Sequence, residues 1–261
     1  MDYWLKQTKD TPLYPELEWD KPERKDLAGK LLILGGNLHG FAAPAKAFEY
    51  ADHSGIGHSR ILLPDALRST LHAFWTDAVF CPSSPSGSFS GKSRDLVLNN
   101  ALWADGILLP GDLGRNSETA ILLDEMLRSM QSPLAITKDA LDYYIERPGT
   151  LINRDNTLIV GSFAQIQKIL KHSGFGEALT YTMPLASLVG TLSRFTSEHA
   201  CTILTRSDNQ FVLTQAGKVL TTKREDIGDV WRLRFASSAI VGWLHHPGKP
   251  FEAIGNSIVT N

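Results

Sequence analysis

The segment Lys30-Leu-Leu-Ile-Leu-Gly-Gly-Asn-Leu-His-Gly40 is the strongest indication of the fold. Four apolar residues lead into Gly35-Gly36, and an Ala-rich run over 42–51 follows. An apolar run that stops at glycine before helical periodicity is typical of a buried parallel strand leading into a helix. Glycine has no side chain, so the backbone amides of this turn can approach a bound ligand. The glycine spacing does not match the dinucleotide pattern G-x-G-x-x-G.

The composition limits the class of protein. A chain of 261 residues with 43% apolar content can bury one large core or two modest ones. Its net charge of −2 does not favour a nucleic-acid partner. The apolar runs are too short for a membrane span, and the N-terminus lacks a signal-peptide pattern. Cys81 and Cys201 fit no zinc spacing. We therefore expect a cytoplasmic protein without a membrane or nucleic-acid partner.

Strand and helix patterns alternate along most of the chain. Strands are expected at 59–64, 77–81, 106–109, 133–137 and 157–160. Helices are expected at 65–75, 94–103, 116–130, 139–145 and 162–172, the third with Asn116 or Ser117 as its cap. This alternation predicts an α/β fold with a mostly parallel sheet and helices on both faces.

The pattern changes after Ala200. Short β-branched segments at 201–205, 211–214 and 218–221 are separated by turn residues, which predicts an antiparallel meander at one sheet edge. Helices at 233–245 and 250–259 follow, and His245-His246 would place positive charge where the helix dipole favours it. No linker-like segment interrupts 30–261, so we expect this range to be a single domain.

Residues 1–29 differ from the rest of the chain. Charged residues, prolines and large aromatics occur without a helical or strand period. We expect an extended arm laid over a surface, with its aromatics, Trp4 and Trp19 among them, as anchors. Such an arm could also reach a neighbouring subunit, and a floppy tail is the alternative.

The Ser/Gly/Pro-rich stretch 82–93 contains Gly87-Ser-Phe-Ser-Gly-Lys-Ser93, which is close to a phosphate-binding loop. That motif needs four residues between its glycines, and only three stand here, so we expect a mobile Ser-rich loop instead.

Glycines and short polar residues stand at three predicted strand ends: Gly35-Gly36, Pro110-Gly-Asp-Leu-Gly114 and Thr137-Lys-Asp139. Ligands of open α/β sheets bind at the carboxyl edge of the strands, so these residues predict a cleft for a small polar molecule. The alternative is that every strand end requires such turn residues.

The same segments, in the same order, resemble the ADP/ATP-dependent NAD(P)H-hydrate dehydratase family. The family's Gly-Gly-Ser, Gly-Ala-Pro and Gly-x-Gly are similar to 35–37, 42–44 and 55–57. Its Gly-Pro-Gly-Leu-Gly-Arg is similar to 110–115, its Asp-Ala-Asp-Ala-Leu to 137–141, and its Leu-Lys-Gly strand and hairpin to the meander from Leu204. The resemblance covers about 29–258 and implies a ribokinase-like fold.

The resemblance also implies site residues. Those expected to bind substrate are Gly35, Gly36, Asn37, Ala43, Gly111, Asp112, Gly114 and Asp139. Those expected to bind the nucleotide are Thr205, Arg206, Arg232 and Arg234. The implied cofactor is ADP or ATP with Mg²⁺, and no protein metal ligand is predicted.

Two family motifs are altered. The family's Thr-Pro-His-x-Gly-Glu would fall near 159–164, where none of its functional residues stands. Its Gly-Thr-Gly-Asp, whose Asp acts as the base, matches Arg232-Leu-Arg-Phe235 when Gly248-Lys-Pro-Phe-Glu-Ala253 anchors the alignment. A second register, with an insertion, matches Gly228-Asp229. We assign no catalytic residue, since Phe235 cannot accept a proton; Asp112 and Asp139 are carboxylates that could replace the base.

Three functions remain open. The first is a divergent dehydratase that phosphorylates the hydroxyl of hydrated NAD(P)H and eliminates phosphate, with reduced or lost activity. The second is a non-catalytic protein, either a pseudoenzyme that binds a nucleotide or nicotinamide derivative or a structural oligomer. The third is a kinase of a small alcohol. A homo-oligomer is expected in each case.

Overall fold

The computed structural model describes residues 3–71, 75, 78–225, 228 and 230–260. In this part of the chain one ten-stranded sheet has the order β1-β10-β9-β8-β7-β6-β5-β2-β3-β4. The strands are β1 (Trp4–Thr8), β2 (Lys30–Leu34), β3 (His58–Pro64), β4 (Val79–Cys81), β5 (Gly106–Leu109), β6 (Leu134–Thr137), β7 (Thr157–Val160), β8 (Thr202–Ser207), β9 (Gln210–Gln215) and β10 (Lys218–Lys223). The run from β4 to β8 is parallel throughout, as the strand–helix alternation predicts.

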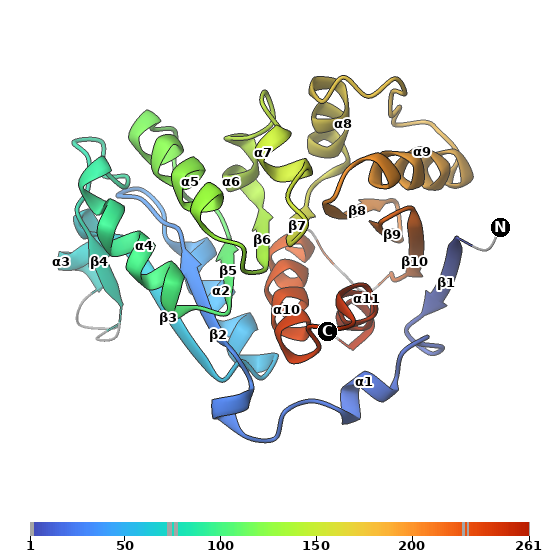
Figure 1. The fold of residues 1–261 in the computed structure, drawn as a ribbon, viewed down its shortest axis with the longest axis horizontal. Coiled ribbons are helices and arrows are strands. Elements are labelled where there is room, and N and C mark those ends of the chain that lie inside the picture. The colour runs from blue at the N-terminus through green and yellow to red at the C-terminus, as the bar shows by residue number, and fades with distance from the viewer. Residues whose placement is uncertain (1–2, 72–74, 76–77, 226–227, 229, 261) are drawn as a thin grey trace.

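Helices cover both faces of the sheet (Figure 1). One face carries α2 (Ala42–His53), α10 (Trp231–His245) and α11 (Pro250–Thr260). The other carries α4 (Arg94–Trp103), α5 (Ser117–Ser129), α6 (Lys138–Asp142), α7 (Gly149–Ile152), α8 (Phe163–His172) and α9 (Leu185–Glu198). The predicted α/β architecture is therefore confirmed. No helix in the described ranges is long and apolar enough to cross a membrane.

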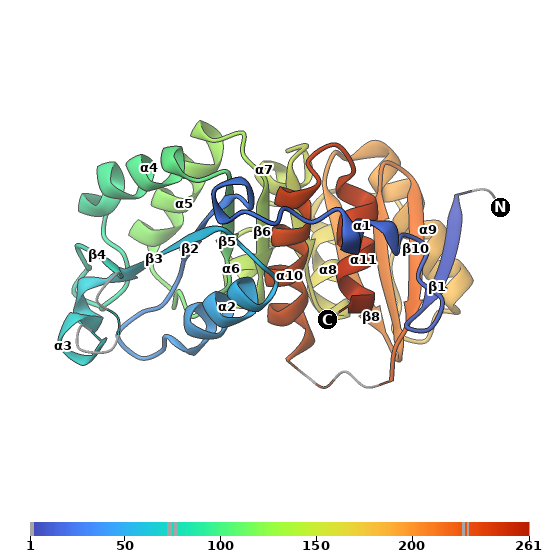
Figure 2. The ribbon, with the colours of Figure 1, turned by 90° about the horizontal axis from the view of Figure 1, so that it is seen from below.

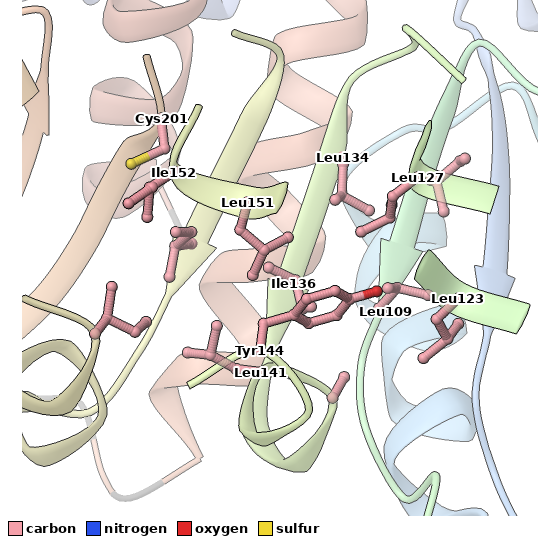
Figure 3. Packing of buried hydrophobic residues seen from close by; sticks show 14 of the residues in the cluster. Leu109, Leu123, Leu127, Leu134, Ile136, Leu141, Tyr144, Leu151, Ile152 and Cys201 are labelled. Atoms are coloured by element: carbon pink, nitrogen blue, oxygen red, sulfur yellow. The ribbon is translucent and has the colours of Figure 1, made fainter. Parts of the chain in front are cut away.

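Alternate residues of each central strand enter opposite cores. In β2, Leu31 and Ile33 pack under α2 and α10, whereas Leu32 and Leu34 face the other layer. A strand buried on both faces needs apolar residues at every position, which explains the continuous runs in the sequence. Figure 3 shows the second layer, where Leu123, Leu141 and Leu151 pack onto Ile136.

The meander β8-β9-β10 is antiparallel, but it does not form the sheet edge. Residues of the arm extend the sheet further, because β1 pairs in parallel with β10 in the register Trp4↔Val219. Gln7 fixes this strand: its Nε2 donates to Thr222 Oγ1 and to the carbonyl of Gly255, both at 2.9 Å. The arm therefore has an ordered strand that its sequence did not indicate.

The rest of the arm passes α10 and α11 on its way to β2 (Figure 2). It includes α1 (Glu16–Trp19), whose buried residue is Leu17. Trp4 is an anchor, since its Nε1 donates to Thr221 Oγ1 at 3.0 Å, but the same expectation for Trp19 is wrong. Trp19 is 88% exposed, because Leu17 occupies the inward side of this single helical turn.

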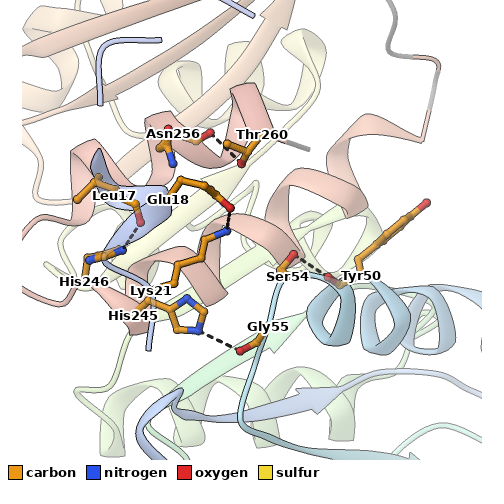
Figure 4. A network of polar contacts seen from close by, with 10 residues as sticks. All are labelled: Leu17, Glu18, Lys21, Tyr50, Ser54, Gly55, His245, His246, Asn256 and Thr260. Atoms are coloured by element: carbon orange, nitrogen blue, oxygen red, sulfur yellow. Dashed lines mark hydrogen bonds and ion pairs between the residues drawn. The ribbon is translucent and has the colours of Figure 1, made fainter. Parts of the chain in front are cut away.

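Polar contacts fasten the arm to the end of α10 (Figure 4). His246 Nε2 donates to the carbonyl of Leu17 at 3.0 Å, and Lys21 pairs with Glu18. His245 Nε2 donates to the carbonyl of Gly55 at 3.2 Å, and burial lowers the pKa of His245. Desolvation therefore disfavours, at His245, the positive charge expected at this helix end.

Other differences lie in segments with weak sequence signals. The helix expected over 65–75 is a 3₁₀ turn (Asp65–Leu67) followed by α3 (Arg68–Leu71), and 72–74 lie outside the described residues. The strand expected from Asp77 is described from Val79, and Asp77 also lies outside that part. The stretch 82–93 is packed rather than mobile: Phe89 is fully buried, and Ser93 Oγ donates to the carbonyl of Pro82 at 2.6 Å.

Candidate functional site

The carboxyl ends of β2, β5 and β6 lie side by side, so their following loops meet. Gly36 donates its N–H to the carbonyl of Gly111 at 3.3 Å. A Cβ on Gly35 would lie 2.7 Å from that same carbonyl oxygen, so only glycine permits this approach. The structure thus brings the first two predicted glycine segments into direct contact.

Asp139 joins the third predicted segment to the second. Its Oδ1 accepts the N–H of Asp112 at 2.7 Å, and its Oδ2 accepts the N–H of Leu113 at 2.9 Å. Gly111 has a φ of +109°, and a Cβ there would overlap Asp139 Oδ1. The carboxylate therefore holds the loop after β5 in a conformation that requires glycine at 111.

Asp112 connects the same loop to α2 and to the start of α6. It has a left-handed backbone (φ +57°), and its Oδ2 accepts the N–H of Ala43 at 2.7 Å. Its Oδ1 pairs with Lys138 Nζ at 3.4 Å, and its carbonyl accepts Asn37 Nδ2 at 2.5 Å. Non-glycine residues in this conformation cost free energy and concentrate at functional sites.

Gln165 is a further residue of this edge that the sequence analysis missed. Its Nε2 donates to the carbonyl of Lys138 at 2.8 Å and to Asp142 Oδ1 at 2.7 Å. Its Oε1 accepts Arg232 Nη1 at 3.1 Å and the N–H of Ser162, also at 3.1 Å. Ser162 and Gln165 form a capping box at the start of α8, and the S-x-x-Q pattern was a usable signal.

A cavity of about 520 Å³ lies beside the loop after β5, on the side of α5, α6 and α8. Of the predicted substrate residues, Gly114 and Asp139 line it, together with Arg115, Asn116, Asp142, Tyr143 and Lys168. The other six, Gly35, Gly36, Asn37, Ala43, Gly111 and Asp112, belong to the neighbouring loop network instead. Tyr143 Oη donates to the carbonyl of Gly114 at 2.8 Å, and burial raises the pKa of this phenol.

A second cavity, of about 390 Å³, lies where β8, α8 and α10 meet. Ser162, Phe163, Tyr181, Arg206, Asp208 and Trp231 are among its lining residues. Arg206 is thus the predicted nucleotide residue that faces a cavity, with its guanidinium 5.3 Å from the Phe211 ring centre. Thr205 is fully buried, and its Oγ1 has no hydrogen-bond partner among the described residues.

The start of α10 is aromatic. The rings of Phe211 and Phe235 meet edge to face with their centres 5.0 Å apart, and Trp231 packs 5.3 Å from Phe211. Phe235 is fully buried on the second turn of the helix, and Arg232 and Arg234 precede it on the half-exposed side. The first turn of α10 carries no acidic residue.

The start of α10 bears on the two registers of the altered Gly-Thr-Gly-Asp motif. Because the helix begins at Trp231, Phe235 lies within it, whereas the dipeptide Gly228-Asp229 stands in the sequence directly ahead of it. Asp229 itself lies outside the described residues.

The donor groups near the second cavity suit a phosphate-bearing ligand. Arg206 lines the cavity, where its Nε donates to the carbonyl of Asp208, and Arg232 contacts Gln165 at the start of α8. Guanidinium groups bind phosphate oxygens through paired N–H donors. No group of three His, Cys, Asp or Glu side chains in the described residues could hold a metal ion.

Known proteins of the same fold agree with this architecture. A ribokinase-like superfamily protein of Enterococcus faecalis superposes with a TM-score of 0.75 at 17% identity, covering 99% of this chain and 86% of that one. An ADP/ATP-dependent NAD(P)H-hydrate dehydratase of Bacillus subtilis, co-crystallised with ATP and Mg²⁺, gives 0.62 at 14% identity, covering 95% and 86%. The chain therefore has the ribokinase-like fold.

Sequence similarity leads to the same group of proteins. A bifunctional NAD(P)H-hydrate repair enzyme of Salinibacter ruber is 32% identical over 127 residues, which are 47% of this chain. The match spans only 23% of that relative's length. No protein-family model matches the chain. The resemblance to NAD(P)H-hydrate dehydratases, expected from the strand-end motifs, is thus confirmed as a similarity of both sequence and fold.

Proposed function

We propose that this chain acts on hydrated nicotinamide nucleotides, as a divergent ADP/ATP-dependent NAD(P)H-hydrate dehydratase with slow turnover. The observation that carries the proposal is the hydrogen-bonded network of Asn37, Asp112 and Asp139. It joins three loops whose sequences match the family's motifs, at the strand edge where ligands of open α/β sheets bind. The similarity to the Salinibacter repair enzyme and the Bacillus dehydratase supports the same activity.

The bound nucleotide would supply a phosphoryl group that turns the substrate hydroxyl into a leaving group. The chain must orient that hydroxyl, remove its proton and exclude water. Asp112 and Asp139 are committed to holding backbone N–H groups, so we assign them the orientation of the loops rather than proton removal. Asp229, directly ahead of α10 in the sequence, is the candidate base.

The test is recovery of nicotinamide absorbance from hydrated NADH in the presence of ADP or ATP and Mg²⁺. We expect slow, nucleotide-dependent recovery that falls at least about 100-fold in Asp229→Asn, the usual scale for loss of a general base. Asp226→Asn is the matched control, because it removes a carboxylate from the same segment and should leave the rate unchanged. Equal loss in both variants would contradict the assignment of Asp229.

A pseudoenzyme that binds the same ligands without converting them is the second candidate. The observation that favours it is the aromatic start of α10, where Trp231 and Phe235 are buried and the first turn has no carboxylate. Comparing ligand binding with turnover distinguishes the pseudoenzyme from the dehydratase. Binding of ADP or NADH without any recovery of absorbance favours the pseudoenzyme, and recovery above a protein-free control excludes it.

A further inference from the structure

Lys138 stands where the resembling family has alanine, in the segment Thr137-Lys-Asp-Ala-Leu141. It follows β6 directly and has a left-handed backbone, with a φ of +54°. Gln165 holds that backbone by donating Nε2 to the carbonyl of Lys138 at 2.8 Å. A lysine in this conformation is strained, and the surrounding contacts must offset that strain. Turn formation alone does not explain a long cationic side chain at this position.

The ammonium group of Lys138 is only loosely engaged. It pairs with Asp112 Oδ1 at 3.4 Å, while the other oxygen of Asp112 accepts the N–H of Ala43 at 2.7 Å. The side chain of Lys138 is 33% exposed and that of Asp112 is 21% exposed. An ammonium has three N–H donors, so Lys138 can bind a second anion while Asp112 stays in place.

A second cation is tied to the same point of the fold. Arg232 donates Nη1 to Gln165 Oε1 at 3.1 Å, and the amide nitrogen of that glutamine is bonded to the Lys138 carbonyl. One side chain therefore fixes both the backbone of Lys138 and the guanidinium of Arg232. The ammonium of Lys138 itself lies beside Asp112, apart from the contacts of that glutamine. Ammonium and guanidinium groups each suit an anion with several oxygens, such as a phosphate or diphosphate.

We propose that Lys138 is a binding and specificity-determining residue that holds a phosphate group of the substrate, with Asp112 as its counter-ion in the free protein. The inference rests on the proposed function in taking a phosphate-bearing nucleotide as the ligand. The phosphate belongs either to the nicotinamide dinucleotide or to ADP, and the two give the same chemistry at the ammonium. The competing explanation is that Lys138 only neutralises Asp112.

Binding measured by calorimetry separates these explanations without relying on turnover. The probes are ADP, NADH and inorganic pyrophosphate, titrated into the wild-type protein and into Lys138→Met and Lys138→Arg. We expect Lys138→Met to weaken the binding of at least one nucleotide and of pyrophosphate by about 10-fold or more. This is roughly the contribution of one charge-assisted contact. Lys138→Arg keeps the charge and should recover most of the affinity.

The control variant is Lys171→Met, which removes an exposed lysine of the last turn of α8 and should bind every probe as the wild type does. If Lys138→Met loses affinity for ADP alone, the phosphate belongs to the phosphoryl donor. If it loses affinity for NADH alone, the phosphate belongs to the dinucleotide. Unchanged affinities in Lys138→Met, or no binding of any probe by the wild-type protein, would overturn the inference. A Lys138-dependent affinity in a protein that shows no turnover would overturn the dehydratase proposal and leave this inference standing.

Discussion

At the scale of single residues, the strand-end loops depend on one carboxylate. Asp139 accepts two backbone N–H groups with its two oxygens, and both bonds are shorter than 3 Å. Hydrogen bonds to a charged group contribute about 1.5–3 kcal/mol each, and an unsatisfied donor adds a desolvation cost. Loop geometry at this edge is thus set by a side chain that the sequence analysis assigned to substrate binding.

Replacing that carboxylate should destabilise the fold measurably. We expect Asp139→Ala to lower the free energy of unfolding by about 2–4 kcal/mol in urea denaturation, because two N–H donors lose their acceptor. The exposed Asp155→Asn serves as the control and should stay within about 0.5 kcal/mol of the wild type. An unchanged unfolding midpoint in Asp139→Ala would show that the network does not hold these loops.

Alanine substitutions at two glycines distinguish the free-energy cost of backbone strain from that of a steric clash. Gly111 has a φ of +109°, and its added Cβ would overlap Asp139 Oδ1; Gly174 has a φ of +79°, with nothing within 4 Å of its added Cβ. We expect Gly174→Ala to cost about 1–2 kcal/mol, the strain alone, and Gly111→Ala to cost more. Equal unfolding free energies for the two variants would contradict the close approach of Asp139.

The roles of some of these residues could be predicted from the sequence and those of others could not, for a physical reason. Glycines such as Gly36 and Gly111 could be predicted, because the residue type itself indicates a backbone conformation that other residues rarely adopt. Gln165 is a hub only because the strand order brings Lys138 and Arg232 to the start of α8, and no local pattern shows that neighbourhood. A capping box alone predicts a helix start, not a link between the backbone of Lys138 and the guanidinium of Arg232.

At the scale of elements, burial determined what could be predicted. β2, β5, β6 and β7 are buried on both faces, so their continuous apolar runs located them closely. The helix α9 was not predicted, although Leu188, Leu192 and Phe195 are buried and recur at helical spacing, so its apolar stripe was a usable signal. β1 was missed because its pairing with β10 is a tertiary contact between distant parts of the chain.

The end of α10 should make stability depend on pH. Burial lowers the pKa of His245, so the unfolded chain binds its proton more readily than the folded one. The neutral, folded form is fully favoured above the unfolded imidazole pKa, about 6.5, and stability falls as the pH drops below it towards the folded pKa. Melting temperatures at pH 8 and pH 5.5 measure this loss.

The variant His245→Gln should reduce that pH dependence, since glutamine keeps a donor for the Gly55 carbonyl and does not titrate. The matched control is His53→Gln, which removes an exposed histidine at the end of α2 and should leave the dependence unchanged. A pH profile identical in wild type and His245→Gln would contradict the assignment to His245.

At the scale of the whole molecule, the arm determines how the sheet ends. β1 covers the edge of β10 within the same chain, and Gln7 ties it to Gly255 in α11. The arm is thus engaged with its own domain, and we propose that any homo-oligomer uses other surfaces. An uncovered strand edge is a site for association between chains.

Deletion of residues 1–12 tests this arrangement. We expect a melting temperature lower by several degrees and a concentration-dependent increase in mass by light scattering, because β10 becomes an open edge. Gln7→Ala, which keeps the strand but loses the bonds to Thr222 and Gly255, should lower the melting temperature without changing the mass. A deletion that dissociates a larger wild-type assembly into stable monomers would instead show that the arm reaches a neighbouring subunit.

We propose that this ribokinase-like chain dehydrates hydrated nicotinamide nucleotides. Its most direct test is a single-turnover experiment in which protein in excess is mixed with hydrated NADH, Mg²⁺ and ATP. An excess of protein makes even slow chemistry visible as one round of absorbance recovery. We expect recovery of the nicotinamide absorbance with one phosphate released per NADH formed, and none without nucleotide. Recovery no faster than in a protein-free control would contradict it.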